Sequence, residues 1–466
     1  MLTYQDFLKA DDLQAFIMSA IYEHKNSEDV KIAQDADLYD LQRNKTINEY
    51  TKILWSITGS PVVDFTASNA KIASNFFHRL NTQRVTYLLG NGVFFKDGDK
   101  TKEELGDDFD KKIKDLASKA LKHKVSFGFW NYDRLYVFPY TEFVPLLDEE
   151  TGVLRAGIRY WQLDRTKPLF IVLYEEDGFT KFRRSESAKP LEVIQKKTAY
   201  KQTYAVSEAG GEEIIGESNY GSLPIIPMWG SERHQSTLVG MQRAIDSYDL
   251  IRSGFANDLT DVAQIYWIIE NAAGMDEEDL QKFLDDIKLR HIAKADTTGG
   301  SKVTPYTQEI PYQARKQYLD DIRAQIYEDF GGLDVHTIAA GATNDHIDAG
   351  YQPMDEEADD FEFQVTEFIK QLLALIGIED EPLYKRNKIS NQMEQVQMVM
   401  QEAQYLDDET ILNKLPNITV DEVKEILKRK DAEDIERFGT LIGANNEPEE
   451  AESGNPEDDE ERQEKR

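Results

Sequence analysis

The sequence predicts an α+β protein. Hydrophobic residues follow helical spacing over roughly the first 125 positions, alternate with period two between about Val125 and Trp229, and return to helical spacing from Ser236 onward. With 466 residues the chain is too long for one compact core, so we expect two or three folded units. Its apolar content of 40% and aromatic content of 11% are typical of a globular protein.

Helices are expected in the N-terminal part of the chain. An amphipathic helix carries its apolar residues three or four positions apart, and several groups of residues before Val125 have this spacing. They are Leu13, Phe16, Ile17, Ala20 and Ile21, then Ile72, Phe76 and Leu80, then Phe109, Ile113, Leu116 and Ala120.

Antiparallel strands are expected in the middle of the chain. Segments with alternating apolar residues are separated by DEETG, DRTKP and EEDG, which favour turns. The predicted strands contain LYVFPY, IRYWQL, LFIVLYEE, FTKFRR and TAYKQTYAV. They end at GSLPIIPMWG, where Pro224 and Pro227 lack the backbone N–H that a central strand needs. We therefore expect an extended exit segment there.

Two long helices should follow and pack antiparallel. Ser236 can cap the first, a helix of about 26 residues and about 40 Å. Its repeating positions, apolar except for one arginine, are Leu238, Met241, Ile245, Tyr248, Arg252, Phe255, Leu259 and Val262. Arg252 is either a surface residue or the partner of an acid on a neighbouring helix or chain. The second helix, Tyr312 to Phe330, lies between Pro311 and Gly331-Gly332 and places Leu319, Ile322, Ile326 and Phe330 on one stripe.

Smaller elements are expected around this helix pair. Between the two helices, QIYWIIEN, a short helix DEEDLQKFLDDIKLR and a strand-turn-strand HIAKADTTGGSKVTPYTQEI predict a small α/β module. A third long helix should run from about Pro353 to Ile376. Later helices are expected from Asn391 to Leu406, over ETILNKL and over VDEVKEILKRK, which Thr419 and Glu422 open with a capping box.

Charge and cysteine content exclude several classes of function. A net charge of −33 argues against a protein that grips DNA by neutralising phosphates. The absence of cysteine excludes thiol chemistry and suits a reducing cytoplasm. We expect a soluble, unprocessed protein, because neither a signal sequence nor a membrane span is recognisable. From Asn445, ten acids against three bases predict a disordered acidic tail, residues 445–466.

Motifs for enzymatic chemistry are weak, and we expect no catalytic residues, metal or cofactor. GGSKVT at Gly299 lacks the order of a phosphate-binding loop and is better interpreted as a hairpin turn. No histidines have metal-ligand or triad spacing. Glu422 and Lys424 resemble part of a metal-dependent nuclease site, which leaves a packaging-associated nuclease as the alternative function.

Two further clusters allow more than one interpretation. The acids Asp355, Glu356, Glu357, Asp359 and Asp360 could form a metal site or an acidic lining, but we favour stabilisation of a helix start by its dipole. The stripe Met393, Val396, Val399 and Met400 favours helix packing over a binding groove.

Several segments together resemble the portal protein family of long-tailed double-stranded DNA bacteriophages. The N-terminal segments are NAKIASNFFHRLNTQRVTYLLGNGVFF and SFGFWNYDRLYVFPYTEFVPLLDEETG followed by IRYW. The central segment is GSLPIIPMWGSERHQSTLVGMQRAIDSYDLIRSGFANDLTD, in which Asp246, Tyr248, Ser253, Asn257 and Asp258 fit the family's pattern. The C-terminal segments are KRNKISNQMEQVQMVMQ and DDETILNKLPNITVDEVKEILKR. Their common order carries the resemblance.

The resemblance implies a structural, non-enzymatic protein of the virion, assembled in the bacterial cytoplasm. Such proteins form a homo-oligomeric ring, typically of twelve subunits, at the portal vertex of the capsid. Double-stranded DNA passes through the ring without sequence specificity during packaging and ejection. The implied partners are terminase, capsid and scaffold proteins and the head-completion adaptor, with no membrane involved.

The resemblance also implies a division of the chain into the parts of a portal subunit. These are a wing (1–230, helical then β-rich), a stem helix (231–263), a clip (264–310), a second stem helix (311–332), a tunnel loop region (333–352), a wing or tunnel helix (353–383), a crown (384–444) and the tail (445–466).

Two parts of this division carry candidate functional residues. The tunnel loop would place small or weakly polar residues near the DNA, namely Thr337, Ala339, Ala340, Gly341, Ala342, Thr343 and Asn344. Small side chains suit copies that converge on one axis, although an exposed connection favours such residues as well. The clip carries Lys282, Lys288, Arg290 and Lys294, which could steer a protein partner. The apolar repeat of the two long helices would pack the stem.

Overall fold

The structure is a computed structural model of an α+β protein. It describes residues 2–55, 59–63, 68–96, 98–186, 189–206, 212–261, 266–270, 278, 281–282, 302–306, 311–335, 344–388, 392–415, 423, 425–430 and 432. They fall into two units. The first comprises the described residues of Met1–Thr337 and Gly350–Lys388, and the second those of Ile338–Ala349 and Ile389–Arg466. Within the described part, no helix has the length and apolar character needed to cross a membrane.

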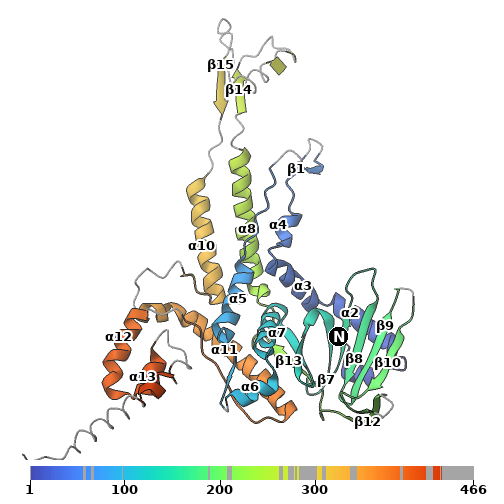
Figure 1. The fold of residues 1–466 in the computed structure, drawn as a ribbon. Coiled ribbons are helices and arrows are strands. Elements are labelled where there is room, and N and C mark those ends of the chain that lie inside the picture. Colours follow the sequence, from blue (N-terminus) through green and yellow to red (C-terminus); the bar gives the residue numbers. More distant parts are fainter. Residues whose placement is uncertain are drawn as a thin grey trace, which may run out of the picture. The chain divides into compact units, whose positions relative to one another are not determined.

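The N-terminal part is mainly helical, as expected. Its helices are α1 (Tyr4–Leu8), α2 (Leu13–Asn26), α3 (Glu28–Asp40), α4 (Lys45–Glu49), α5 (Phe76–Leu89), α6 (Asp99–Leu105) and α7 (Phe109–His123) (Figure 1). Short strands β1 (Ile53–Trp55), β2 (Pro61–Val63) and β3 (Phe94–Phe95) lie between them. Asp12 caps α2 by accepting hydrogen bonds from two backbone N–H groups.

The expected helical stripe that begins at Ile72 is corrected by the structure. Helix α5 starts only at Phe76. The backbone N–H of Ile72 donates to the hydroxyl of Ser253, 3.0 Å away on a distant helix, so it is not part of a helical hydrogen-bond series.

The predicted antiparallel region forms a five-stranded sheet in the order β10-β9-β8-β7-β6. The strands are β6 (Phe143–Leu147), β7 (Leu154–Trp161), β8 (Leu169–Glu175), β9 (Gly178–Arg184) and β10 (Glu192–Thr198). Side chains alternate between the two faces. One face buries Ile158 and Ile171 against Ile17 of α2, and the other buries Phe143 and Val172 against aromatic residues of a second sheet.

The second sheet has three strands in the order β13-β4-β5. They are β4 (Val125–Asn131), β5 (Arg134–Pro139) and β13 (Ile225–Trp229). Pro227 lies opposite Phe127 in the edge strand β13, so the expected extended segment pairs at the edge, where proline is tolerated. A separate hairpin, β11 (Lys201–Val206) and β12 (Glu212–Ser218), precedes β13.

The two long helices are α8 (Leu238–Asp261) and α10 (Tyr312–Phe330). Ser236, predicted to cap the first, accepts a hydrogen bond from the N–H of Leu238 over 3.2 Å. Between the helices, β14 (Tyr266–Glu270) pairs antiparallel with β15 (Lys302–Tyr306). Strand β15 therefore lies within HIAKADTTGGSKVTPYTQEI, where a strand was expected, and it pairs with β14, which lies within QIYWIIEN. Most of the predicted module lies outside the described residues.

The C-terminal elements are α11 (Asn344–Ile376), β16 (Pro382–Leu383), α12 (Gln392–Glu402) and α13 (Asp408–Lys414). Helix α11 corrects the expected start at Pro353, because this proline lies inside the helix. Phe361, Val365, Phe368 and Leu372 of α11 enter the core beside α5 and α7. In the Met-rich stripe of α12, Val399 is buried whereas Val396 and Met400 are exposed.

Candidate functional site

The α8–α10 pair is held by the apolar repeat predicted from the sequence. Leu238, Met241 and Ile245 of α8 are buried in one cluster with Ile322 and Ile326 of α10. The cluster also contains Phe76, Phe77 and Leu80 of α5. Tyr248 and Leu319 are half-buried. This half of the helix pair is therefore anchored in the body of the first unit.

The other half of the pair is held by polar and aromatic contacts. Phe255 of α8 lies 5.7 Å from the ring of Tyr312 at the start of α10, Asp258 forms an ion pair with Arg315, and Ser247 lies 3.1 Å from the hydroxyl of Tyr318. These contacts join late residues of α8 to early residues of α10, which confirms the antiparallel packing. Leu259, Tyr312 and Tyr318 are exposed in the single chain, and Val262 lies outside the described residues.

A row of polar side chains on α8 binds the backbone of the segment before α5. The N–H groups of Ala70, Ile72 and Ser74 donate to the side chains of Asn257, Ser253 and Asp249, over 2.6, 3.0 and 2.9 Å. We call these three bonds the side-chain ladder. Alternate N–H groups of an extended chain point the same way, and every fourth residue of a helix lies on one face. The two repeats are close in length, and the two segments run in opposite directions.

The ladder continues into a partly buried polar cluster at the start of α4. Asn44 donates to the second oxygen of Asp249 over 2.9 Å, and Thr46 donates to Asp246 over 2.8 Å. The hydroxyl of Tyr39 also donates to Asp246. Burial raises the pKa of Asp249, and the hydrogen bonds from Asn44 and Ser74 oppose that shift.

The family resemblance pointed to Asp246, Tyr248, Ser253, Asn257 and Asp258 but not to Asp249. A signal was present, because Asp249, Ser253 and Asn257 are polar at helical spacing beside the apolar stripe. Arg252, whose role was open, is exposed and lies 6.0 Å from the ring centre of Tyr248. This placement fits a surface residue.

The acids near Pro353 are paired with basic side chains. Arg386 binds Asp355 over 2.9 Å and Glu362 over 3.0 Å, and also binds Asp359. Lys388 binds Asp355 over 2.8 Å. Burial would raise the pKa of Asp355, but hydrogen bonds from Lys388, Tyr87 and Arg386 outweigh it and the pKa is lowered.

These pairs correct the interpretation of the acids as a helix start. Helix α11 begins at Asn344, so Asp355 lies about three turns inside it, beyond the reach of the terminal dipole. Glu357 instead binds the buried guanidinium of Arg84, 3.1 Å away. Among the residues that the structure describes, no group of three or more potential ligands is placed to hold a metal ion.

The predicted DNA-contacting loop lies almost wholly outside the described residues. Thr337, Ala339, Ala340, Gly341, Ala342 and Thr343 are not described, and Asn344 is the first residue of α11. Of the predicted clip residues, Lys282 is helical and exposed, whereas Lys288, Arg290 and Lys294 lie outside the described part. Glu422 and Lys424, the candidate nuclease residues, also lie outside the described part.

Comparisons with known proteins agree on one family. The model of the family described as phage portal protein, SPP1 Gp6-like, matches residues 19–436. The portal protein of Clostridium phage phiCD119 is 28% identical over 390 residues, which cover 77% of this chain and 83% of that protein. The portal protein of Bacillus phage SPP1 is 25% identical over 337 residues, which cover 67% of this chain and 63% of that protein. This chain therefore belongs to the SPP1 Gp6-like phage portal protein family.

Proposed function

We propose that the chain is one subunit of a ring-shaped channel, typically of twelve copies, at one vertex of a phage capsid. Double-stranded DNA would enter through it during packaging and leave through it at ejection. The observation that supports this most is the α8–α10 pair, whose outer half exposes Leu259, Tyr312 and Tyr318. Apolar surface of this kind is covered in closed assemblies by a neighbouring copy.

The charge of the chain supports passage of DNA rather than its retention. With 87 acidic against 54 basic residues and a net charge of −33, the subunit disfavours tight binding of phosphates, because each neutralised phosphate would strengthen binding. The proposed contact is the loop that contains Thr337, Ala339 to Thr343 and Asn344. Its small side chains leave room for other copies and for a moving duplex.

The remaining parts of the chain have proposed partners. The clip, residues 264–310, would face terminase during packaging and the head-completion adaptor afterwards, with Lys282, Lys288, Arg290 and Lys294 steering acidic partners. The wing, residues 1–230, would contact capsid and scaffold proteins. The ATP-driven step would belong to terminase. The nuclease alternative has no support, because the family is structural rather than enzymatic.

Electron microscopy of the purified protein, with mass measured on the same sample, tests this proposal. Rings with a central hole and a mass near twelve times the 53.5 kDa chain are the expected result. A strict monomer at all concentrations and salt conditions, also in the presence of capsid and scaffold proteins, would contradict the proposed channel.

A further inference from the structure

The β11–β12 hairpin exposes apolar side chains on a two-stranded ribbon. Tyr204 and Ile214 lie directly opposite each other and are 50% and 48% exposed, and Ile215 beside them is 64% exposed. In the described part of the chain the two strands pair only with each other. A ribbon of two strands is marginally stable in water without a packing partner. The hairpin therefore has an apolar face that the single chain leaves uncovered.

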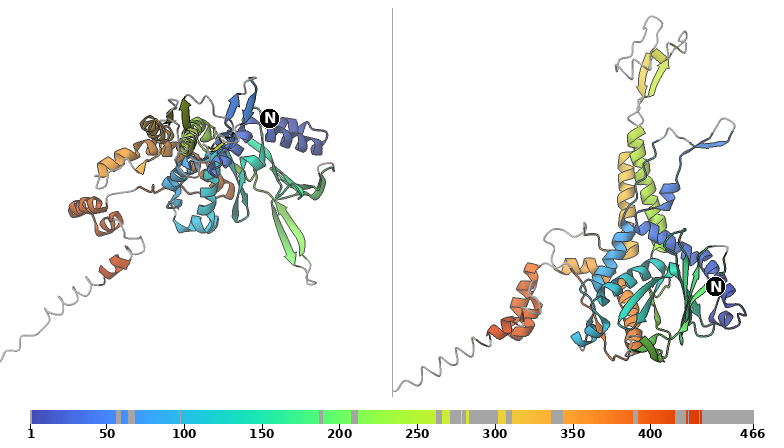
Figure 2. Two further views of the ribbon diagram at one scale, coloured as in Figure 1. Left: turned by 90° about the horizontal axis from the view of Figure 1, so that it is seen from above. Right: turned by 45° about the vertical axis from the view of Figure 1, so that its right-hand side comes forward.

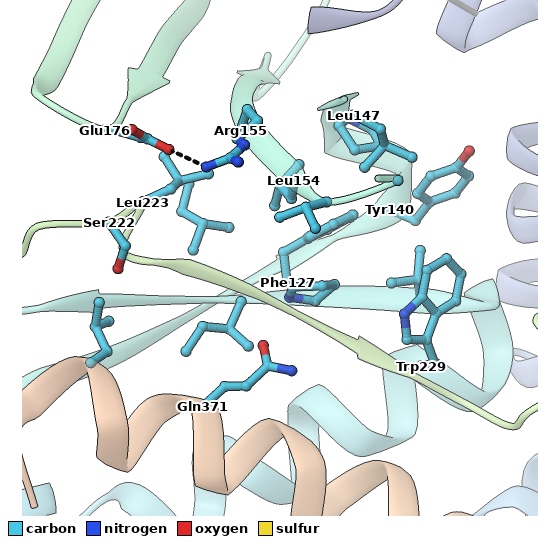
Figure 3. A pocket seen from close by; sticks show the side chains of 18 of the residues that line it. Phe127, Tyr140, Leu147, Leu154, Arg155, Glu176, Ser222, Leu223, Trp229 and Gln371 are labelled. Carbon is cyan, nitrogen blue, oxygen red and sulfur yellow. Dashed lines mark hydrogen bonds and ion pairs between the residues drawn. The ribbon is translucent and has the colours of Figure 1, made fainter. Parts of the chain in front are cut away.

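A cavity of about 740 Å³ opens beside the base of this hairpin. It lies between the β6–β7 turn, strand β13 and helix α11, and its walls are largely apolar. Figure 3 shows Leu154, Leu223 and Trp229 around the same space, with Arg155 and Glu176 joined at its edge. That ion pair spans 3.1 Å, and Lys124 and Asp29 form a second one at 2.8 Å. A cavity of this size and character suits a few bulky apolar side chains.

The hairpin is fixed at its base by hydrogen bonds of Tyr200. Tyr200 is buried, and its hydroxyl donates to the carbonyl of Glu175 over 2.7 Å. Its N–H donates to Asn219 over 3.0 Å, which holds the two ends of the hairpin together. Tyr204 follows four residues later, about 13 Å along the strand. Figure 2 shows the hairpin projecting from the sheets. The exposed side chains of Tyr204 and Ile214 are therefore accessible to a second copy of the chain.

The charges of the hairpin and of the sheet beside the cavity are opposite. Residues 201–218 contain four acids and one lysine. Residues 154–198, which form β7 to β10, contain ten bases and six acids in a chain whose net charge is −33. The hairpin of one copy is therefore attracted to the sheet of another, in a chain whose overall charge repels it.

We propose that the β11–β12 hairpin of one subunit inserts Tyr204 and Ile214 into the cavity between β13 and α11 of a neighbouring subunit. This inference rests on the proposed ring, which supplies the second copy at a fixed position. The insertion buries two bulky side chains and gives the ribbon the packing partner that it lacks. It links neighbouring subunits through the sheets as well as through the α8–α10 pairs.

The natural absence of cysteine allows a direct test by disulfide cross-linking. One chain would carry Ile214→Cys and one affinity tag, and a second chain would carry Val153→Cys, at the cavity mouth, and another tag. Both are co-expressed, and the assembled protein is oxidised. We expect a covalent dimer that carries both tags. In the matched control, Leu163→Cys replaces Val153→Cys, because Leu163 is exposed but does not line the cavity.

The outcomes separate this inference from the proposed channel. Rings that yield the doubly tagged dimer with Val153→Cys, and far less with Leu163→Cys, support the insertion. Rings without that dimer overturn the insertion and leave the channel intact. Protein that stays monomeric contradicts both proposals.

A second variant tests the apolar contact without cross-linking. Ile214→Asp places a charge where the proposal puts an apolar side chain, so half-assembly of rings should require about tenfold more protein. Ile53→Asp on β1 changes a similarly exposed isoleucine outside the hairpin and the sheet that it would meet, and should have little effect. Equal assembly of the two variants would count against the insertion.

Discussion

The carboxylate of Asp249 on α8 accepts a hydrogen bond from the backbone N–H of Ser74, 2.9 Å away, and both atoms belong to segments far apart in sequence. Asp249 is fully buried, and its other oxygen accepts from Asn44. One side chain thus joins α8, the entry to α4 and the approach to α5.

Asp249→Ala should lower the stability of the first unit by about 2–3 kcal/mol, because it leaves the buried amide of Asn44 and the partly buried N–H of Ser74 without an acceptor. Asp249→Asn should cost less. Its amide oxygen can still accept from Ser74, but its nitrogen then faces the donor of Asn44. The melting temperature by calorimetry measures both effects, and Asp320→Ala at an exposed position of α10 is the control. Equal melting temperatures for all three variants would contradict the role of Asp249.

The stability of the first unit should depend on pH through His24. This side chain is buried, and burial followed by the charge of Lys25 lowers its pKa to about 4. Tyr160 donates to the carbonyl of Thr141 over 2.7 Å, so His24 Nδ1–H donates to the Tyr160 oxygen over 3.1 Å. Within the described part, His24 Nε2 has no hydrogen-bond partner.

The sign of this dependence follows from the two protonation states. Below its ordinary pKa of about 6.5 the unfolded histidine binds a proton that the folded one rejects until pH is near 4. The stabilisation of the fold by neutral His24 is therefore complete above pH 6.5, and about 3 kcal/mol of the free energy of unfolding is lost as the pH falls toward 4. Melting temperatures across this range should fall less for His24→Phe than for the natural chain. The exposed His234→Asn should follow the natural chain.

Arg386 should contribute salt-sensitive stability to α11. Arg386→Ala removes the shared cation from Asp355, Asp359 and Glu362 and should cost about 1 kcal/mol, because these groups are partly exposed. Arg386→Lys should retain only part of this stability, since an ammonium cannot bind several carboxylates as a planar guanidinium does. Melting temperatures at low and high salt are compared with those of Arg134→Ala, whose pair with Asp133 is well exposed. A variant that loses nothing at low salt would count against this role.

The residues from Ala339 to Thr343 should be dispensable for ring formation but needed for packaging. Deleting them should leave rings intact and reduce the DNA that heads protect from nuclease. Replacement by Gly-Ser-Gly-Ser-Gly should preserve packaging, because it keeps the loop small, whereas Ala340→Trp should impair it. Rings that fail to form after the deletion would make the loop an assembly element instead.

The sequence predicted the elements whose signal is periodic. The apolar spacing of Leu238, Met241 and Ile245 gave the buried side of α8, and alternation gave the antiparallel sheets. It did not predict the start of α11, because proline usually marks a helix boundary. Tertiary packing overrides that preference here. Tyr351 stacks on Tyr87 with ring centres 5.5 Å apart, and Met354 is buried, so the helix continues on both sides of Pro353.

The side-chain ladder could not be predicted from spacing alone. Its acceptors are visible on α8, but its donors are backbone N–H groups, which every residue except proline carries. The residue types around Ile72 do not distinguish this segment from others whose backbone N–H groups could have bound α8. The pairing of Arg386 with the acids of α11 was missed for a related reason, since at 30% charged residues many pairs are possible and only the fold selects one.

The two repeats of the side-chain ladder are close but unequal, so successive donors and acceptors drift slowly out of register. Two residues of an extended chain advance about 6.6 Å, and four residues of a helix advance about 6.0 Å. The difference is small over three hydrogen bonds and grows with each added one, so the mismatch limits how many bonds the ladder can contain. The ladder also requires an even number of residues between successive donors of the extended segment. One residue inserted between Ala70 and Ser74 would turn an N–H group away from α8, and the point where the chain enters α5 is thereby set by the turns of a different helix.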